Sequence, residues 1–216
     1  MKTHYLQFTH IFGSALLLSL SVQSAENWTR YDAPPTGSKV TIEGTSNFPG
    51  HERWTLEGLI IGGYVEMDPT FDSAPKPGNV SARALVTIPV RSLKSGKAPM
   101  DSVMQQTMKQ TDHPRIQYRL TEMLLKEAPK SPEGPYQFDT KGELTVAGVT
   151  NKISMPVSME RIDKTKLKFS GSTPIKMTDY GVTPPSPLGL GLFIKTGNEV
   201  KIIFEWITVQ RAETAK

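Results

Sequence analysis

Side chains that could carry out catalysis or hold a metal are few in this sequence. The chain has no cysteine and four histidines, of which only His51 and His113 lie beyond the first 25 residues. His51 stands beside Glu52 in a Pro-Gly loop, and His113 directly precedes a proline. Histidine can act as a general base or a metal ligand, but a metal site usually needs three or four converging ligands. A hydrolase-type enzyme that uses His51 or His113 is therefore only an alternative interpretation.

Other signatures of catalysis or of polyanion binding are also missing from the sequence. It has no serine nucleophile elbow, phosphate-binding loop or paired-carboxylate motif. The net charge is +4, and the basic residues are interspersed with acidic ones. Nucleic-acid binding usually needs a clustered basic stripe, so this pattern indicates a solvated surface. We expect a protein that is not an enzyme, holds no metal or cofactor and binds no nucleic acid.

Methionines and large aromatic residues remain as the side chains that could serve a function. Methionine is flexible and polarisable and adapts to a variable apolar guest, and aromatic side chains supply large apolar walls. Ordinary packing in a core stays open for each of them. The candidate lining residues of an apolar cavity are Trp54, Leu56, Val86, Met100, Met104, Met108, Tyr118, Met155, Val157, Met159, Phe169, Phe204 and Trp206.

Strands are the elements that must position most of these side chains. In the stretch 141–160, Leu144 and Val146 alternate with polar residues before a short turn that contains Gly148, and residues 153–159 alternate after it. Alternation with period 2 predicts a hairpin with one apolar and one wet face. We expect Met155, Val157 and Met159 to face inward.

Further alternating stretches predict an antiparallel sheet with about eight or nine strands. They cover residues 38–43, 54–67, 80–88, 116–120, 167–177 and 198–210. Three glycines in 54–67 indicate a bend, and 167–177 is interpreted as two extended pieces around Gly171 and Pro174. Within 99–110 the methionines recur at helical spacing, which predicts one helix. Strands in this number close into a barrel or stack as a sandwich.

Four motifs in order resemble those of the YceI-like family, whose members are bacterial and mostly exported. They are the strand 80–93, the helix 100–108 followed by His113-Pro-Arg-Ile-Gln-Tyr118, the hairpin Gly142-Glu-Leu-Thr-Val-Ala-Gly-Val-Thr150, and Lys176-Met-Thr-Asp-Tyr-Gly-Val182. The first strand departs from the Val-x-Phe-x-x-x-His pattern of many members. The resemblance spans residues 38 to 209.

The resemblance implies an all-β fold, an antiparallel lipocalin-like barrel of about eight strands with one inserted helix and an apolar interior. It also implies that an isoprenoid quinone or a prenyl lipid binds inside. A barrel of this size can instead be filled by its own side chains, so a packed barrel that acts as an interaction or structural protein is the main alternative.

The first 25 residues predict a localisation outside the cytoplasm. A basic Lys2 precedes the short apolar run 11–22 and small residues near Ser24, which is typical of a cleaved signal peptide. The run is too short to span a membrane. We expect residues 26–216 to form a single soluble periplasmic domain without a transmembrane segment. Its apolar loop 182–193 either caps the barrel, touches a membrane surface transiently or packs on the core.

Overall fold

The computed structural model describes residues 28–50, 52–72, 75–127, 129, 131, 134–186 and 195–212. These residues are mostly strands, with one α-helix and short 3-10 helices, as the alternating sequence predicts. The elements are β1 (Thr29–Asp32), β2 (Lys39–Ser46), β3 (Arg53–Gly58), β4 (Gly62–Met67), η1 (Pro69–Asp72), β5 (Gly78–Asn79), β6 (Ala82–Pro89), η2 (Val90–Ser92), α1 (Ala98–Thr107), β7 (Arg115–Glu127), β8 (Tyr136–Val146), β9 (Val149–Arg161), β10 (Lys166–Lys176), η3 (Met177–Tyr180) and β11 (Thr196–Gln210).

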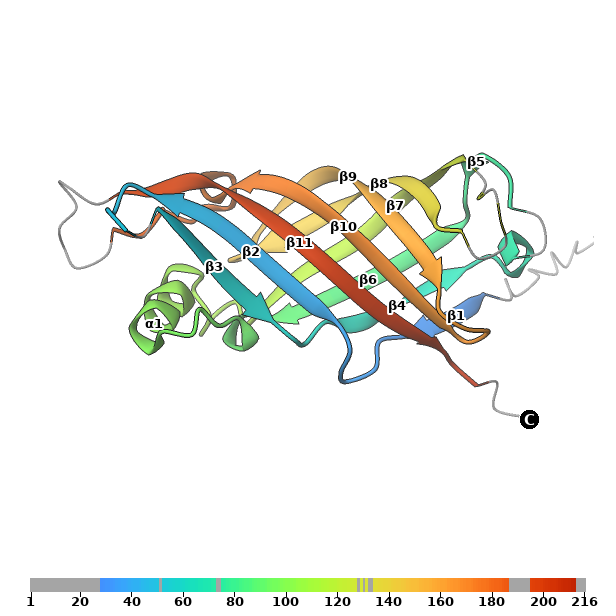
Figure 1. The fold of residues 1–216 in the computed structure, drawn as a ribbon, viewed down its shortest axis with the longest axis horizontal. Helices are drawn as coiled ribbons and strands as arrows, with labels where there is room; N and C mark the ends of the chain where they lie inside the picture. Colours follow the sequence, from blue (N-terminus) through green and yellow to red (C-terminus); the bar gives the residue numbers. More distant parts are fainter. Residues whose placement is uncertain are drawn as a thin grey trace, which may run out of the picture.

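The sheet closes on itself, which confirms the predicted barrel (Figure 1). Neighbouring strands follow the order β1-β4-β6-β7-β8-β9-β10-β11, and β1 also pairs with β11, so eight antiparallel strands form a ring. Toward the α1 end, the same edge of β11 pairs with β2, which in turn pairs with β3. β1 and β2 therefore act as two halves of one barrel strand, and β3 and β4 as two halves of another.

The predicted bend in residues 54–67 is confirmed by the break between β3 and β4. Gly63 has a φ of +118°, and a Cβ built there would lie 1.9 Å from the carbonyl oxygen of Leu85 on β6. Only glycine can adopt this backbone and let β6 come so close. Residues 167–176, by contrast, form one continuous strand instead of the two expected pieces, because β10 pairs with β11 along its whole length, and Met177 begins η3.

The hairpin of β8 and β9 has the predicted inward face. Ala147 and Gly148 both have positive φ, 49° and 85°, and form the two-residue turn that suits the twist of the flanking strands. Val157 and Met159 are buried, and Met155 is half-buried against the core. This hairpin therefore supplies one wall of the barrel interior.

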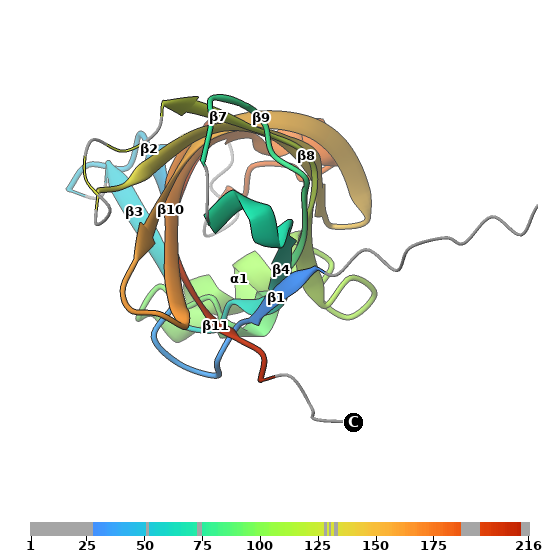
Figure 2. The same ribbon diagram turned by 90° about the vertical axis from the view of Figure 1, so that its right-hand side faces the viewer.

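The barrel interior is filled at the end that carries η1. The Phe71 ring of η1 lies 5.4 Å from the ring of Tyr136 and 6.0 Å from that of Phe138, measured between centroids. A view along the barrel shows η1 inside the ring of strands (Figure 2). Met159 and Leu125 are almost fully buried beside this cluster. Because α1 lies at the opposite end (Figure 1), the two ends of the barrel differ in what fills them.

An ion-pair network on the outer wall holds β1 at the seam of the barrel. The buried carboxylate of Glu66 on β4 accepts hydrogen bonds from Arg30 of β1 and Arg83 of β6. Asp32 of β1 accepts from Arg211, which follows β11, at 2.7 Å. Burial alone would raise the pKa of Glu66, but the hydrogen bonds and charges of the two arginines outweigh it and lower that pKa. The short β1 is thus tied to both of its neighbours by charged groups.

Candidate functional site

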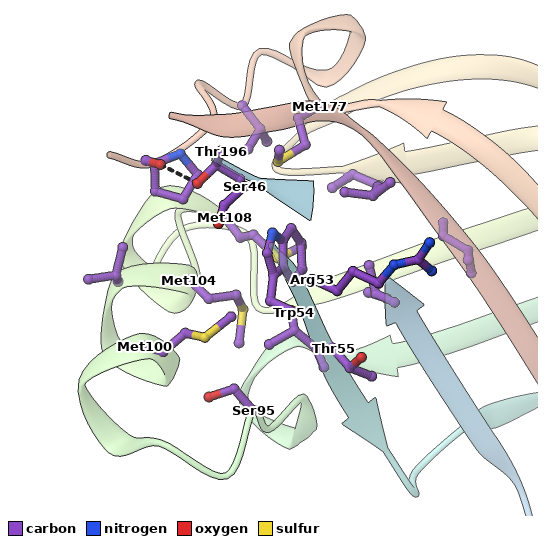
Figure 3. A pocket seen from close by; sticks show the side chains of 18 of the residues that line it. Ser46, Arg53, Trp54, Thr55, Ser95, Met100, Met104, Met108, Met177 and Thr196 are labelled. Carbon is purple, nitrogen blue, oxygen red and sulfur yellow. Dashed lines mark hydrogen bonds between the residues drawn. The ribbon is translucent and has the colours of Figure 1, made fainter. Parts of the chain in front are cut away.

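The half of the barrel next to α1 encloses a cavity of about 630 Å³ (Figure 3). Inward-facing aliphatic residues of the strands form its walls, among them Ile42 of β2, Leu56 of β3, Ile116 of β7, Val146 of β8 and Val200 of β11. These residues face inward because side chains alternate along each strand. The volume is within the range of small-molecule sites, which are mostly apolar and concave. The cavity is therefore the candidate site of this molecule.

Helix α1 covers one side of the cavity with methionines. Met100, Met104 and Met108 are four residues apart, so they share one face, and all three line the cavity (Figure 3). The loop before the helix is fixed by Asp101, whose Oδ1 accepts hydrogen bonds of 2.7 Å from the backbone N–H and the hydroxyl of Ser95. These bonds lower the pKa of Asp101. The helix is confirmed, although it ends at Thr107 and not near Gln110.

Trp54 forms a flat part of the wall because a glycine lies beneath its ring. Gly44 of β2 pairs directly with Trp54 of β3, and a Cβ on Gly44 would lie 2.0 Å from the Cζ2 atom of the indole. The indole Nε1 donates a hydrogen bond to the carbonyl oxygen of Thr45 at 3.1 Å. The ring is therefore held against the strand, and its apolar face lines the cavity.

Polar groups line the cavity at few places. The charged residues among the described lining are Arg53 and Lys97, both exposed, and no carboxylate is among them. The lining residues that carry hydroxyls are Ser46, Thr55, Ser95, Tyr180 and Thr196. Figure 3 shows the hydrogen bond that the Thr196 hydroxyl donates to the carbonyl oxygen of Pro185. This distribution suits a guest with a long apolar part and a small polar group near the solvent.

Five of the thirteen residues singled out in the sequence line this cavity: Trp54, Leu56, Met100, Met104 and Met108. The structure places the other eight elsewhere in the barrel interior. Four are buried in the core and four are partly buried against it. The buried four are Val157, Met159, Phe169 and Trp206, and the partly buried four are Val86, Tyr118, Met155 and Phe204.

Several aliphatic lining residues were not singled out from the sequence. They include Ile42, Ile116, Val146, Ile175 and Val200. All of them lie at inward-facing positions of an alternating strand, and this alternation is the sequence pattern that could have identified them. Alternation identifies the inward face but not the height of a residue along the barrel.

The histidines do not form a catalytic or metal-binding arrangement in the part of the chain that can be described. The ring of His113 packs over the hairpin turn, where a Cβ on Gly148 would lie 2.5 Å from its Cε1 atom. His51 lies outside the described residues. Among the described residues, no three side chains of the metal-ligating types gather in one place. His113 therefore has a packing role at the turn.

No helix among the described residues has the length and hydropathy needed to cross a membrane. The apolar loop 182–193 is described only as far as residue 186. Val182 and Pro185 from its described part line the cavity, and residues 187–194 lie outside the described ranges.

Solved structures with the same fold come from several bacteria. BcnA of Burkholderia cenocepacia is 18% identical with a TM-score of 0.60, and the match covers 82% of this chain and 99% of that one. A polyisoprenoid binding domain from Saccharophagus degradans, implicated in plant cell wall breakdown, is 14% identical with a TM-score of 0.63 over 84% of this chain and 98% of that one. The YCEI protein of Campylobacter jejuni is 19% identical with a TM-score of 0.51 over 78% and 85%.

No curated protein matches the sequence. The family model of the YceI-like domain matches residues 31–207, which include every strand of the closed ring except the first residues of β1 and the last of β11. With this match over most of its length and the closed barrel that the neighbours share, the chain belongs to the YceI-like family.

Proposed function

We propose that this protein is an exported carrier that holds an isoprenoid quinone or prenyl lipid in its barrel for transport or sequestration. The cavity of about 630 Å³ between α1 and the strands is the observation that carries this proposal. The barrel is not filled by its own side chains at this end, so the packed barrel of the alternative interpretation is less consistent with the structure. The family membership and the polyisoprenoid binding domain of Saccharophagus degradans support the choice of ligand class.

Burial of hydrocarbon would drive binding. Each Å² of apolar surface removed from water contributes about 25 cal/mol before the entropic costs of association are subtracted. The methionines of α1 can adjust their rotamers to chains of different shape. A polar head group would stay beside exposed Arg53 and Lys97, where it keeps its contact with water. The process needs no covalent step, metal or further cofactor.

Export is part of the proposal and rests on residues 1–25. Their basic start, apolar run and small residues are those of a cleaved signal peptide. N-terminal sequencing of the protein from its host should begin near Ala25 or Glu26. A mature chain that still begins at Met1 would rule out this processing.

Native mass spectrometry of the protein purified from its own host tests the carrier function. We expect a co-purified apolar molecule that dissociates on collisional activation. The variant Ile202→Trp places a large side chain in the cavity. We expect this variant to be purified without the bound molecule. The matched control is Ile203→Trp on the same strand, because residue 203 is not part of the cavity lining and should leave the ligand in place.

Two outcomes contradict the carrier proposal. Wild-type protein that is repeatedly empty would favour the packed barrel as an interaction protein. A ligand that is retained equally by Ile202→Trp and wild type, with both correctly folded by circular dichroism, would place the bound molecule outside this cavity.

A further inference from the structure

The cavity ends halfway along the barrel at two aromatic side chains. The deepest lining residues on their strands include Ile116 of β7 and Ile202 of β11. The next inward-facing residues, two positions further from the α1 end, are Tyr118 and Phe204, and neither lines the cavity. Each strand shows inward residues at every second position, so these two side chains occupy the next layer of the interior. Beyond them lies the core that is plugged by η1.

Both aromatic rings are fixed by glycines on neighbouring strands. A Cβ on Gly142 of β8 would lie 2.4 Å from the Cζ atom of Tyr118, and a Cβ on Gly171 of β10 would lie 2.9 Å from the Cζ atom of Phe204. The rings therefore occupy space that a side chain would otherwise fill. The hydroxyl of Tyr118 also lies 3.5 Å from that of Thr140, which in turn donates to the carbonyl oxygen of Met155 at 2.9 Å.

Other side chains at the next inward positions of their strands are buried. Val40 pairs with Phe204, Leu144 pairs with Tyr118, and Thr173 lies two residues before Ile175 on β10. All three are buried, with exposed fractions of 1%, 5% and 7%. None of these three residues lines the cavity, and neither Tyr118 nor Phe204 does, so this layer marks the inner end of the cavity. We name Tyr118 and Phe204 the aromatic floor.

We infer that the aromatic floor limits the ligand to an apolar chain of about twenty carbons, and this inference rests on the proposed carrier function. A water molecule takes up about 30 Å³ of liquid and a methylene group is of similar size, so 630 Å³ holds on the order of twenty carbon atoms. This corresponds to about four isoprene units. A longer chain leaves its remaining units outside the cavity, where they gain no burial.

Competition among prenyl alcohols of 10, 15, 20, 25 and 40 carbons tests the limit. Delipidated protein is incubated with equimolar mixtures, and the bound fractions are read by native mass spectrometry. Each methylene that enters the cavity adds at most about fourfold in affinity, so a five-carbon isoprene unit adds at most about a thousandfold. Because ordering the chain offsets part of this gain, we expect affinity to rise by about tenfold or more per isoprene unit up to 20 carbons. From 25 to 40 carbons it should change by less than about threefold.

Variants of the floor make the test specific to these residues. Phe204→Ala removes six ring carbons and makes room for about one more isoprene unit, so the chain length at which affinity stops rising should shift from 20 to 25 carbons. Phe204→Leu is a milder variant with a smaller shift in the same direction, and it serves where the alanine variant does not fold. Phe169→Ala is the matched control, because Phe169 is an equally large buried aromatic that does not belong to the floor.

The outcomes separate the floor from the carrier function itself. Wild-type affinity that keeps rising tenfold per unit to 40 carbons would overturn the length limit and leave the carrier intact. An unchanged length limit in folded Phe204→Ala and Phe204→Leu would overturn the assignment of the floor. If no alcohol of any length binds, the carrier proposal fails, and the length limit fails with it.

Discussion

Replacing Gly44 by alanine should disturb the cavity wall through a single side chain. The added Cβ would lie 2.0 Å from Cζ2 and 2.3 Å from Cε2 of Trp54, and real Cβ atoms do not approach other atoms so closely. Gly44 is buried on β2 and paired with Trp54, so the backbone cannot yield without breaking the pairing with β3. The indole must therefore leave its place on the wall.

The size of the effect follows from what the indole loses. Overpacking a well-packed position costs about 1–3 kcal/mol, and loss of the hydrogen bond from Nε1 to the carbonyl of Thr45 adds about 1 kcal/mol. We expect Gly44→Ala to lower the free energy of unfolding by about 2–4 kcal/mol in urea titrations. A ring that swings into the cavity should also lower the affinity for a fluorescent apolar probe at least tenfold, because the probe and the ring compete for the same space.

A control and a double-mutant cycle make this prediction specific to Trp54. Gly62→Ala should be neutral within about 0.5 kcal/mol or slightly stabilising, because the nearest atom to its Cβ is the carbonyl oxygen of Thr87 at 3.8 Å. In the background of Trp54→Ala, the Gly44 substitution should lose most of its cost, with a coupling of about 1–3 kcal/mol. The same cost in both backgrounds would refute the reasoning, and so would unchanged probe affinity in folded Gly44→Ala.

Two further predictions concern the seam and the methionines. Glu66→Gln should destabilise the protein by about 2 kcal/mol at pH 7, less than a fully buried pair because Arg83 is exposed. Since the folded pKa of Glu66 is lowered, its contribution is present above its ordinary value of 4.5 and is lost as the pH falls through the folded pKa, so the difference between the urea midpoints of the two proteins should shrink as the pH is lowered below 4.5. A difference that stays constant between pH 7 and pH 3 would contradict this assignment. Met159→Ala should lower the free energy of unfolding by about 2–5 kcal/mol without changing the affinity for the probe. Met104→Ala should lower the free energy of unfolding by less, because the Met104 side chain already borders the cavity, and it should change the affinity for the probe more than threefold. Equal effects of both methionine variants on binding would show that the packed half of the barrel also takes up the probe.

The barrel was predictable because its strands are long and one-sided. Period-2 alternation in 141–160 and 198–210 locates the inward face without any knowledge of pairing, and the structure confirms it at Val157 and Met159. The break at Gly63 was also visible, since glycines inside a strand indicate bends. Strand β1 was not predicted, because its four residues are too short to show a period. The closure of the ring depends on that strand and on its charged contacts, which are long-range.

The location of the cavity was less predictable than its chemical character. The methionines of α1 and of β9 are the same residue type and both lie on inward faces. Even so, Met104 lines the cavity, whereas Met159 lies in the packed half of the barrel. What separates them is the entry of Phe71 into one end of the barrel. Phe71 follows Asp68-Pro69, which indicates only the end of a strand, and no local pattern shows that the chain turns inward there. Which half remains hollow is therefore a property of the assembled barrel.

The sequence does contain one indication of where the cavity lies, namely glycines that pair with aromatic rings. Gly44 lies beneath Trp54, Gly142 beneath Tyr118 and Gly171 beneath Phe204, and each glycine interrupts an otherwise regular strand. A glycine inside a strand weakens it, so its presence indicates a close approach by another group. In this barrel an aromatic ring approaches each of these three glycines, once on the cavity wall and twice at its floor, and at Gly171 the carbonyl oxygen of Pro156 comes closer still, at 2.7 Å from the position of a Cβ. If the floor limits the ligand, then a family member with a branched residue in place of Gly171 cannot keep an aromatic ring at the position of Phe204, and its cavity must have a different depth.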